Sequence, residues 1–354
     1  MSELVRRPVG TTPDGVEVHA LDLSHGPLAV TVLTYGARLQ SVVVPDRDGR
    51  PGEVTLGYDD LAGYLGDRAF LGATVGRYAN RIGGGRFTLD GTEHRLPQNH
   101  GTATLHGGAD GFHTRVWDAE EAADGVALRL RSPDGDMGFP GAVDVAVTVT
   151  LDDDGLRLAY EATTDAPTVV TLTNHAYWNL AGPGTGTVDD HVLTVPAARY
   201  LPVDDAFVPL GDPVPVEGTV FDLRDGARLG DRVRHGDEQL RLAGGFDHCY
   251  VLDGADSGDD GADGLALAAR VHDPASGRTL EVRTDEPGLQ VYTGNQLPGT
   301  VAGRDGRVMR QGDGLCLETQ HWPDSPNRPS YPSTVLRPGE VLRSTTLHTF
   351  GTTS

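Results

Sequence analysis

The chain has 354 residues, of which 38% are hydrophobic, and a formal net charge of −22 at pH 7. So acidic a chain is repelled by nucleic-acid backbones and anionic membranes, and neither is expected as a partner. All 29 basic residues are arginine, which excludes mechanisms that need a lysine, such as Schiff-base catalysis or a nucleotide-binding loop with a phosphate-binding lysine.

The start of the sequence, residues 1–10, carries charge early and lacks the apolar stretch of a secretory signal. No later segment approaches the roughly 20 apolar residues that span a bilayer. We therefore expect a cytoplasmic protein. The two cysteines, Cys249 and Cys316, form no CxxC pair, so a cysteine-rich zinc site is excluded and two buried apolar side chains are expected.

Most of the chain shows apolar and polar residues alternating in short runs between turn-forming residues, which indicates β-strands. The clearest runs lie in residues 28–46, 86–96, 141–164 and 265–285. In the second run, Asp90-Gly91 is a strong signal for a β-hairpin. Only residues 59–65 suggest a helical turn. We predict an all-β chain whose residues 1–354 form a single large sandwich domain.

Two segments look like breaks in this pattern. Residues 254–264 are small and acidic, but strand-like runs flank them closely, so we interpret them as a long hairpin loop rather than a domain junction. The glycines at 182–187 lack the spacing of a nucleotide-binding loop and predict a turn.

Asn80 and Arg81 stand together in the sequence GRYANRI. Arginine offers a rigid fork of donors and asparagine both a donor and an acceptor, which suits a hydroxyl-rich ligand; an ordinary surface loop is the alternative. Further on, His100 and His106 lie among glycines, but their spacing matches no standard metal site, so no metal is expected.

The stretch TLTNHAYWNL, residues 171–180, is rich in β-branched and aromatic residues and predicts a strand. In a strand, His175 shares a face with Tyr177, and Trp178 takes the opposite face. A histidine in this position is either a hydrogen-bonded core residue or a group aimed at a ligand.

Two acidic residues adjoin or interrupt apolar runs. Glu318 lies in GLCLETQHWPD, a run otherwise fit for a buried strand. Burial would raise the pKa of this carboxyl towards neutrality, which suits a general base; an exposed glutamate on an edge strand is the alternative. Asp247 precedes another apolar run, either as a turn residue or as a ligand-binding group. Together these residues fit proton transfer on a polar, uncharged ligand.

Eight stretches of the chain resemble, in order, the aldose 1-epimerases, also called galactose mutarotases. They are LGYDDLAGY, GATVGRYANRIGGGRFTLDG, TLHGG, LTNHAYWNLAG, GTVFDLR, GFDHCYVL, GLQVYTGNQL and LCLETQHWPDSPNRPSYPSTVLRPGE. They fall between about residues 28 and 350. The resemblance implies a large antiparallel β-sandwich of galactose mutarotase type, no cofactor, and a free aldose as the small-molecule partner.

The resemblance also implies roles for single residues. His175 matches the general acid and Glu318 the general base. The sugar-binding positions are matched by Asn80, Arg81, His106, Asp247 and Gln290, and Tyr177 is expected to add to the pocket.

The implied reaction opens and recloses the sugar ring. Glu318 removes the proton of the C1 hydroxyl while His175 protonates the ring oxygen, and the two exchange roles on closure. A carboxylate near His175 is expected to raise the pKa of the ring and keep it an acid near pH 7. Two alternatives stay open: an epimerase for a hexose 6-phosphate, bound by Arg77, Arg81 and Arg86, and a sugar-binding sandwich without catalysis. The sequence carries no signal for an oligomeric state.

Overall fold

The structure, a computed structural model, describes residues 3–252 and 264–353. It consists mainly of antiparallel strands, so the all-β prediction is confirmed. Of the loop predicted at residues 254–264, all but Gly264 lies outside the described residues.

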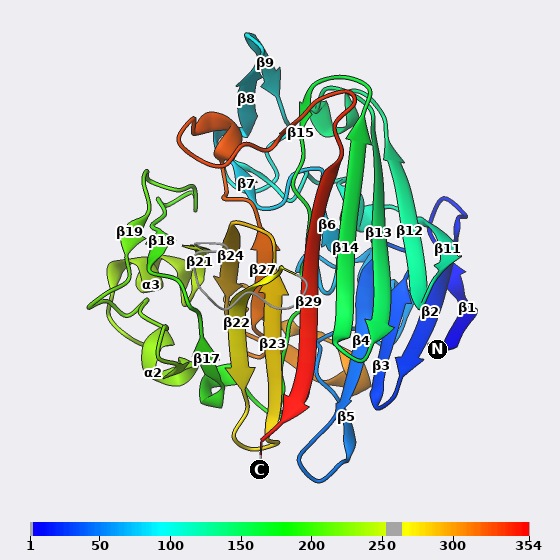
Figure 1. Cartoon of the computed structure of the whole chain (residues 1–354), viewed down its shortest axis with the longest axis vertical. Coiled ribbons are helices and arrows are strands. Elements are labelled where there is room, and N and C mark those ends of the chain that lie inside the picture. Colours follow the sequence, from blue (N-terminus) through cyan, green and yellow to red (C-terminus); the bar gives the residue numbers. More distant parts are fainter. Residues whose placement is uncertain (1–2, 253–263, 354) are drawn as a thin grey trace.

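The largest sheet (Figure 1) has the strand order β11-β12-β13-β14-β29-β23-β22-β17-β20. Its strands are β11 (Asp118–Ala122), β12 (Gly125–Ser132), β13 (Val143–Asp152), β14 (Gly155–Thr164), β17 (Val192–Thr194), β20 (Ala227–Arg228), β22 (Ala266–His272), β23 (Arg278–Thr284) and β29 (Leu342–Thr352). The last of these along the chain, β29, pairs with β14 on one side and β23 on the other, and so joins the two parts of the sheet.

Two five-stranded sheets complete the layers. The first runs in chain order through β1 (Glu3–Thr11), β2 (Glu17–His25), β3 (Leu28–Leu33), β4 (Arg38–Pro45) and β5 (Pro51–Glu53), and packs against β13 and β29. The second has the order β19-β18-β21-β24-β27, with β18 (Arg199–Leu201), β19 (Val214–Pro215), β21 (Asp247–Val251), β24 (Gly288–Tyr292) and β27 (Cys316–Gln320).

The remaining strands are short and pair two by two. They are β6 (Thr74–Val75) with β16 (Thr173–Asn174), β7 (Arg81–Ile82) with β10 (Thr104–Leu105), β8 (Arg86–Leu89) with β9 (Thr92–Arg95), β15 (Thr168–Val169) with β28 (Val335–Leu336), and β25 (Pro298–Ala302) with β26 (Val308–Arg310).

The helices are short. The predicted helical turn is α1 (Leu61–Leu65), while α2 (Leu229–Val233) and α3 (Glu238–Ala243) were not predicted. These two have five and six residues, too few to show a helical repeat in the sequence. Within residues 3–252 and 264–353, no helix is long and apolar enough to cross a membrane.

The four clearest alternating runs form the predicted hairpins β3–β4, β8–β9, β13–β14 and β22–β23. In β8–β9 the turn residues Asp90 and Gly91 have φ angles of 48° and 82°. This left-handed conformation is the one that a two-residue hairpin turn requires, which explains the Asp-Gly pair.

The predicted strand at residues 171–180 is only partly formed. Strand pairing is limited to the two residues of β16, and Thr171 and Trp178 make isolated bridges to other segments. The predicted alternation of side chains nevertheless holds, because Trp178 is buried in the core while His175 and Tyr177 line a cavity.

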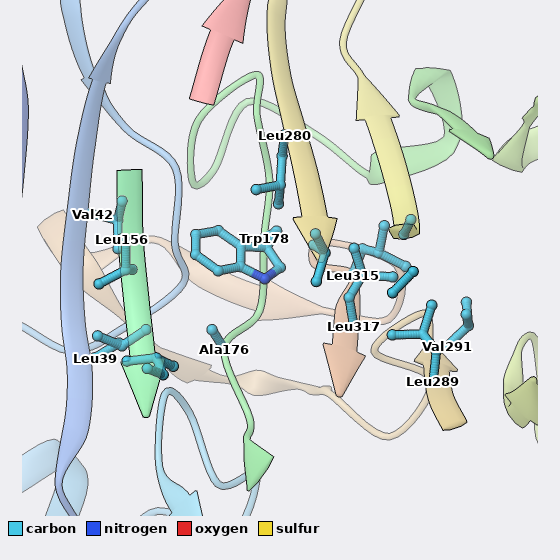
Figure 2. Packing of buried hydrophobic residues seen from close by; sticks show 14 of the residues in the cluster. Leu39, Val42, Leu156, Ala176, Trp178, Leu280, Leu289, Val291, Leu315 and Leu317 are labelled. Atoms are coloured by element: carbon cyan, nitrogen blue, oxygen red, sulfur yellow. The ribbon is translucent and has the colours of Figure 1, made fainter. Parts of the chain in front are cut away.

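The same alternation recurs in neighbouring segments (Figure 2). The core takes six side chains from three of them: Ala176 and Trp178, Leu289 and Val291 of β24, and Leu315 and Leu317 around the start of β27. The intervening residues, which include His175, Gln290 and Glu318, therefore face the other way. One side of these segments builds the core and the other side builds the site.

Candidate active site

A cavity of about 570 Å³ lies on the side of these segments that faces away from the core. Seven of the eight predicted site residues line it: Asn80, Arg81, His106, His175, Tyr177, Asp247 and Glu318. The exposed part of the wall is mixed, with Val301 and Ala302 of β25 beside Arg68 and Gln296. A polar floor with a partly apolar rim suits a small ligand with several hydroxyl groups.

Glu318 is held on the floor of the cavity by β27. All five residues of this strand are buried, although it is the last strand in its sheet. The segment around β16 covers β27, and Leu315 bridges to Trp178. The alternative of an exposed edge-strand glutamate is therefore wrong, because the carboxylate side chain is only 2% exposed.

Two aromatic rings stack on the imidazole of His175. The ring centroid of Tyr177 lies 5.1 Å from that of His175, and the ring centroid of Phe70 lies 5.8 Å from it. At the ring edges, Nε2 lies 3.7 Å from Oε1 of Glu318, and Nδ1 lies 3.5 Å from Sγ of Cys316. The ring therefore presents one nitrogen to the carboxylate in the cavity and the other to a thiol.

Burial shifts the pKa values of this pair in opposite directions. It lowers the pKa of His175 to about 4 and raises that of Glu318 well above its usual range. The expectation that a nearby carboxylate raises the pKa of His175 is thus wrong, because desolvation of the charged ring outweighs the attraction. The pKa of Glu318 is raised by burial, as predicted from the sequence.

Asn80, Arg81 and His106 are brought together by the pairing of β7 with β10. Asn80 and His106 have φ angles of 62° and 51°, and each donates its backbone N–H to the other: His106 to the carbonyl oxygen of Asn80, and Asn80 to Nδ1 of His106. Burial lowers the pKa of His106 far below its usual value. Because Nδ1 accepts a hydrogen bond, the neutral ring carries its proton on Nε2.

Asp247 begins β21 and is held from two sides. Its Oδ1 accepts a 2.6 Å hydrogen bond from Nε2 of Gln290, and its Oδ2 lies 3.5 Å from a guanidinium nitrogen of Arg81. Gln290 is buried but does not line the cavity. Its hydrogen bond holds it against the carboxylate of Asp247.

The loop of residues 66–71 was not identified from the sequence. Asp67 forms a buried 2.8 Å ion pair with Arg38 and also accepts hydrogen bonds from the backbone N–H groups of Ala69 and Leu71. Phe70, at a φ of 58°, lies with its ring centroid 4.7 Å from that of His106 and 5.8 Å from that of His175. The loop thus sets an aromatic wall against both histidines.

His106, His175 and Glu318 also form a group whose ligand atoms all lie within 4.8 Å of one another. Two histidines and a glutamate are a known zinc donor set. However, Nδ1 of His106 accepts the N–H of Asn80, so Nε2 bears the proton and has no free electron pair for a metal. The donor chemistry of this group favours hydrogen bonding to oxygen.

The residues that suggested other ligands do not join the cavity wall. Arg77 is buried and donates to the carbonyl oxygens of Ser132, Pro133, Pro140 and Gly141. Arg86 is exposed, and neither it nor His100 is among the residues that line the cavity. Of the three arginines considered for a phosphate, Arg81 alone lines the cavity.

Comparisons with known proteins find similarity over nearly the whole chain. A family model described as aldose 1-epimerase matches residues 19–349. The galactose mutarotase of Rattus norvegicus is 43% identical over 351 residues, 99% of each chain, and the aldose 1-epimerase of Escherichia coli K12 is 38% identical over 343 residues, 96% of each chain. The crystal structure of galactose 1-epimerase from Lactobacillus acidophilus aligns with a TM-score of 0.86 and 31% identity, covering 100% of this chain and 99% of the other.

Proposed function

The chain belongs to the aldose 1-epimerase family and interconverts the α and β anomers of free aldoses, and we propose that Glu318 and His175 carry out this isomerisation. Because relatives at 43% and 42% identity are named galactose mutarotase, we take galactose as the first substrate, with glucose as the second.

The distance between the two groups supports this assignment. The reaction exchanges protons at O1 and O5, two oxygens bonded to the same carbon, so acid and base must lie close together. Nε2 of His175 and Oε1 of Glu318 are 3.7 Å apart, and both residues line the cavity. This juxtaposition is the observation that carries the proposal.

In the opening step, ionised Glu318 takes the proton of the C1 hydroxyl and protonated His175 gives its Nε2 proton to the ring oxygen. The C1–O5 bond breaks as O1 becomes the aldehyde oxygen. The open sugar then faces a neutral carboxyl and a neutral imidazole. After rotation about the C1–C2 bond, the same transfers run backwards and the ring closes on its other face.

The open-chain intermediate matches the protonation that burial favours. A neutral carboxyl and a neutral imidazole contain the same number of protons as the ion pair that starts the reaction. Because burial raises the pKa of Glu318 and lowers that of His175, the site favours the neutral pair and thereby stabilises the product of ring opening.

The other cavity residues hold the sugar. Arg81 and the Nε2–H group of His106 donate to hydroxyl oxygens, whereas Asp247 accepts from hydroxyl groups. Loss of one such contact leaves a buried partner unsatisfied, at a cost of about 1–3 kcal/mol. Tyr177 donates its hydroxyl to the carbonyl oxygen of Ala69, so its contribution to the site is the ring face that packs on His175.

The test follows the optical rotation of freshly dissolved α-galactose with and without the protein. Glu318→Gln and His175→Asn should each lower kcat by about 10²- to 10⁴-fold while sugar binding, measured by calorimetry, persists. Near wild-type rates in both variants would refute the assignment. Binding without any acceleration by the wild-type protein would instead indicate a sugar-binding sandwich without catalysis.

A second glutamate–histidine pair, with a buried glutamate, offers a matched control. Glu286 and His321 lie 2.6 Å apart, and neither residue lines the cavity. Glu286→Gln removes a buried carboxylate of the same type, and kcat should remain at the wild-type value. Rates on glucose and glucose 6-phosphate, measured with the same preparation, test the phosphosugar alternative.

A further inference from the structure

The two histidines of the site differ in what faces their second ring nitrogen. At His106, a backbone N–H donates to Nδ1 and fixes the proton on Nε2. At His175, the neighbour of Nδ1 is the sulfur of Cys316, at 3.5 Å. A thiol can accept as well as donate a hydrogen bond, so it does not force the proton onto Nε2.

The reaction itself requires a particular tautomer of His175. The ring gives its Nε2 proton to O5 during opening and must take it back there during closure. Between these steps, Nε2 must carry a free electron pair, so the remaining proton must stay on Nδ1 throughout. A buried Nδ1–H group needs a hydrogen-bond acceptor.

Cys316 is placed to be that acceptor by the strand that also carries Glu318. The two residues are two positions apart on β27, and both side chains therefore leave the same face of the strand. Oε1 of Glu318 lies beside Nε2 of His175, and Sγ of Cys316 lies beside Nδ1 of the same ring. One strand thus contacts both edges of the imidazole, on which Phe70 and Tyr177 stack.

We propose that Cys316 is a positioning residue whose sulfur accepts the Nδ1–H of His175, so that protons enter and leave the ring only through Nε2. The inference rests on the proposed function of His175. Cys316 exchanges no proton with the sugar in any step.

An uncharged acceptor suits this position better than a carboxylate. A negative charge beside Nδ1 would stabilise the imidazolium and hold its proton, whereas burial here lowers the pKa of His175 to about 4. Burial also raises the pKa of the Cys316 thiol well above its usual range, so the sulfur stays neutral. The ring can therefore release its Nε2 proton readily.

The test compares Cys316→Ala and Cys316→Ser. Alanine removes the acceptor and should lower kcat by about 10- to 100-fold, as the loss of a group that orients a catalytic histidine does elsewhere. KM should stay within about threefold because no sugar contact is lost. Serine restores an acceptor and should keep kcat within about tenfold of the wild type.

A spectroscopic measurement separates positioning from a general loss of structure. In ¹⁵N-histidine-labelled protein at pH 7, the resonances that disappear in His175→Asn identify this ring. They should report the Nδ1–H tautomer in the wild type and in Cys316→Ser, and a shift towards the Nε2–H tautomer in Cys316→Ala. Cys249→Ala is the matched control: this cysteine is also buried and free, and it packs with Leu201 and Tyr331 outside the cavity wall, so both kcat and tautomer should be unchanged.

Each outcome has a distinct meaning. Wild-type kcat in Cys316→Ala, or an Nε2–H tautomer in the wild-type protein, would overturn the role of Cys316 while His175→Asn remained inactive. Full activity of His175→Asn would instead overturn the proposed function. If Cys316→Ala fails to fold, the tautomer of the wild type still decides the proposal.

Discussion

His175 and Glu318 share an enclosed position, and burial reverses the usual order of their pKa values. The pair works only while it holds a single exchangeable proton in total. With two protons there is no base for the C1 hydroxyl, and with none there is no acid for the ring oxygen. Activity should therefore follow a bell-shaped dependence on pH.

The acid limb of this profile is expected at about pH 4, where His175 takes up the second proton. The alkaline limb belongs to Glu318, whose raised pKa extends the one-proton state upward. The measurement is kcat from polarimetry against pH, with the spontaneous rate subtracted at every point. An acid limb near pH 6.5, the usual histidine value, would contradict a burial-lowered pKa.

The sequence singles out the two residues proposed to react more readily than the residues that contact them. Glu318 stands out because a carboxylate in an apolar run is costly, and His175 because a titratable ring interrupts a strand-like stretch. Cys316 and Gln290 have no such signal, since a cysteine or a glutamine in a strand is unremarkable. Their roles arise from hydrogen bonds between segments far apart in the sequence.

At the scale of elements, the segment of residues 171–180 shows what periodicity can and cannot predict. Its alternation correctly separates core-facing Trp178 from cavity-facing His175 and Tyr177. It does not predict that strand pairing stops after Asn174, because pairing depends on the partner β6, which has only two residues. The hairpins were predictable because their turns contain local signals, such as Asp90-Gly91.

The loop of residues 66–71 depends on the ion pair between Arg38 and Asp67, whose side chains are 1% and 0% exposed. Arg38→Met leaves a buried carboxylate without its cation and should lower the free energy of unfolding by about 3–5 kcal/mol. Because this loop carries Phe70, kcat should fall as well. Urea titration monitored by circular dichroism, together with polarimetry, measures both effects.

Arg50→Met is the control for that variant. Arg50 pairs with Asp48 at 2.9 Å, but the two side chains are 76% and 57% exposed. Solvent screens such a pair, so stability and activity should hardly change. Equal losses in the two variants would show that burial of the Arg38 pair has no special importance for the loop.

At the scale of the whole molecule, six buried histidines make stability depend on pH. Burial lowers the pKa to about 4 for His175, His191, His248 and His348, to about 3 for His113, and far below the usual value for His106. Their pKa in the unfolded chain is about 6.5, so between pH 6.5 and 4 the unfolded chain binds more protons than the native protein. The free energy of unfolding should therefore decrease as the pH is lowered through this window, by up to about 1.4 kcal/mol per pH unit for each histidine.

Glu318 opposes this trend, because a raised carboxyl pKa makes the native state bind its proton first, which adds stability as the pH falls. The pKa values of Asp285, Asp313 and His321 are raised as well and act in the same direction. These four groups do not offset the six buried histidines. Urea titrations between about pH 6.5 and 5, a range that lies within the window above, measure the slope.

Single substitutions test the origin of that slope. His348 is 3% exposed. The slope reports how many more protons the unfolded chain binds than the native protein, and His348→Phe should reduce this difference by about one proton. His235 is exposed, and His235→Gln should leave the slope unchanged. A pH-independent stability in the wild type would show that the buried rings take up protons in the native protein as readily as in the unfolded chain.

The position of β29 within the nine-stranded sheet has a consequence for synthesis of the protein. Until residues 342–352 leave the ribosome, β14 and β23 each lack the neighbour that β29 supplies. Both are long enough to recruit a foreign strand, because an unpaired edge offers a row of free backbone donors and acceptors. Before residues 342–352 are synthesised, β14 and β23 are therefore the strands at which we expect the nascent chain to be open to aggregation.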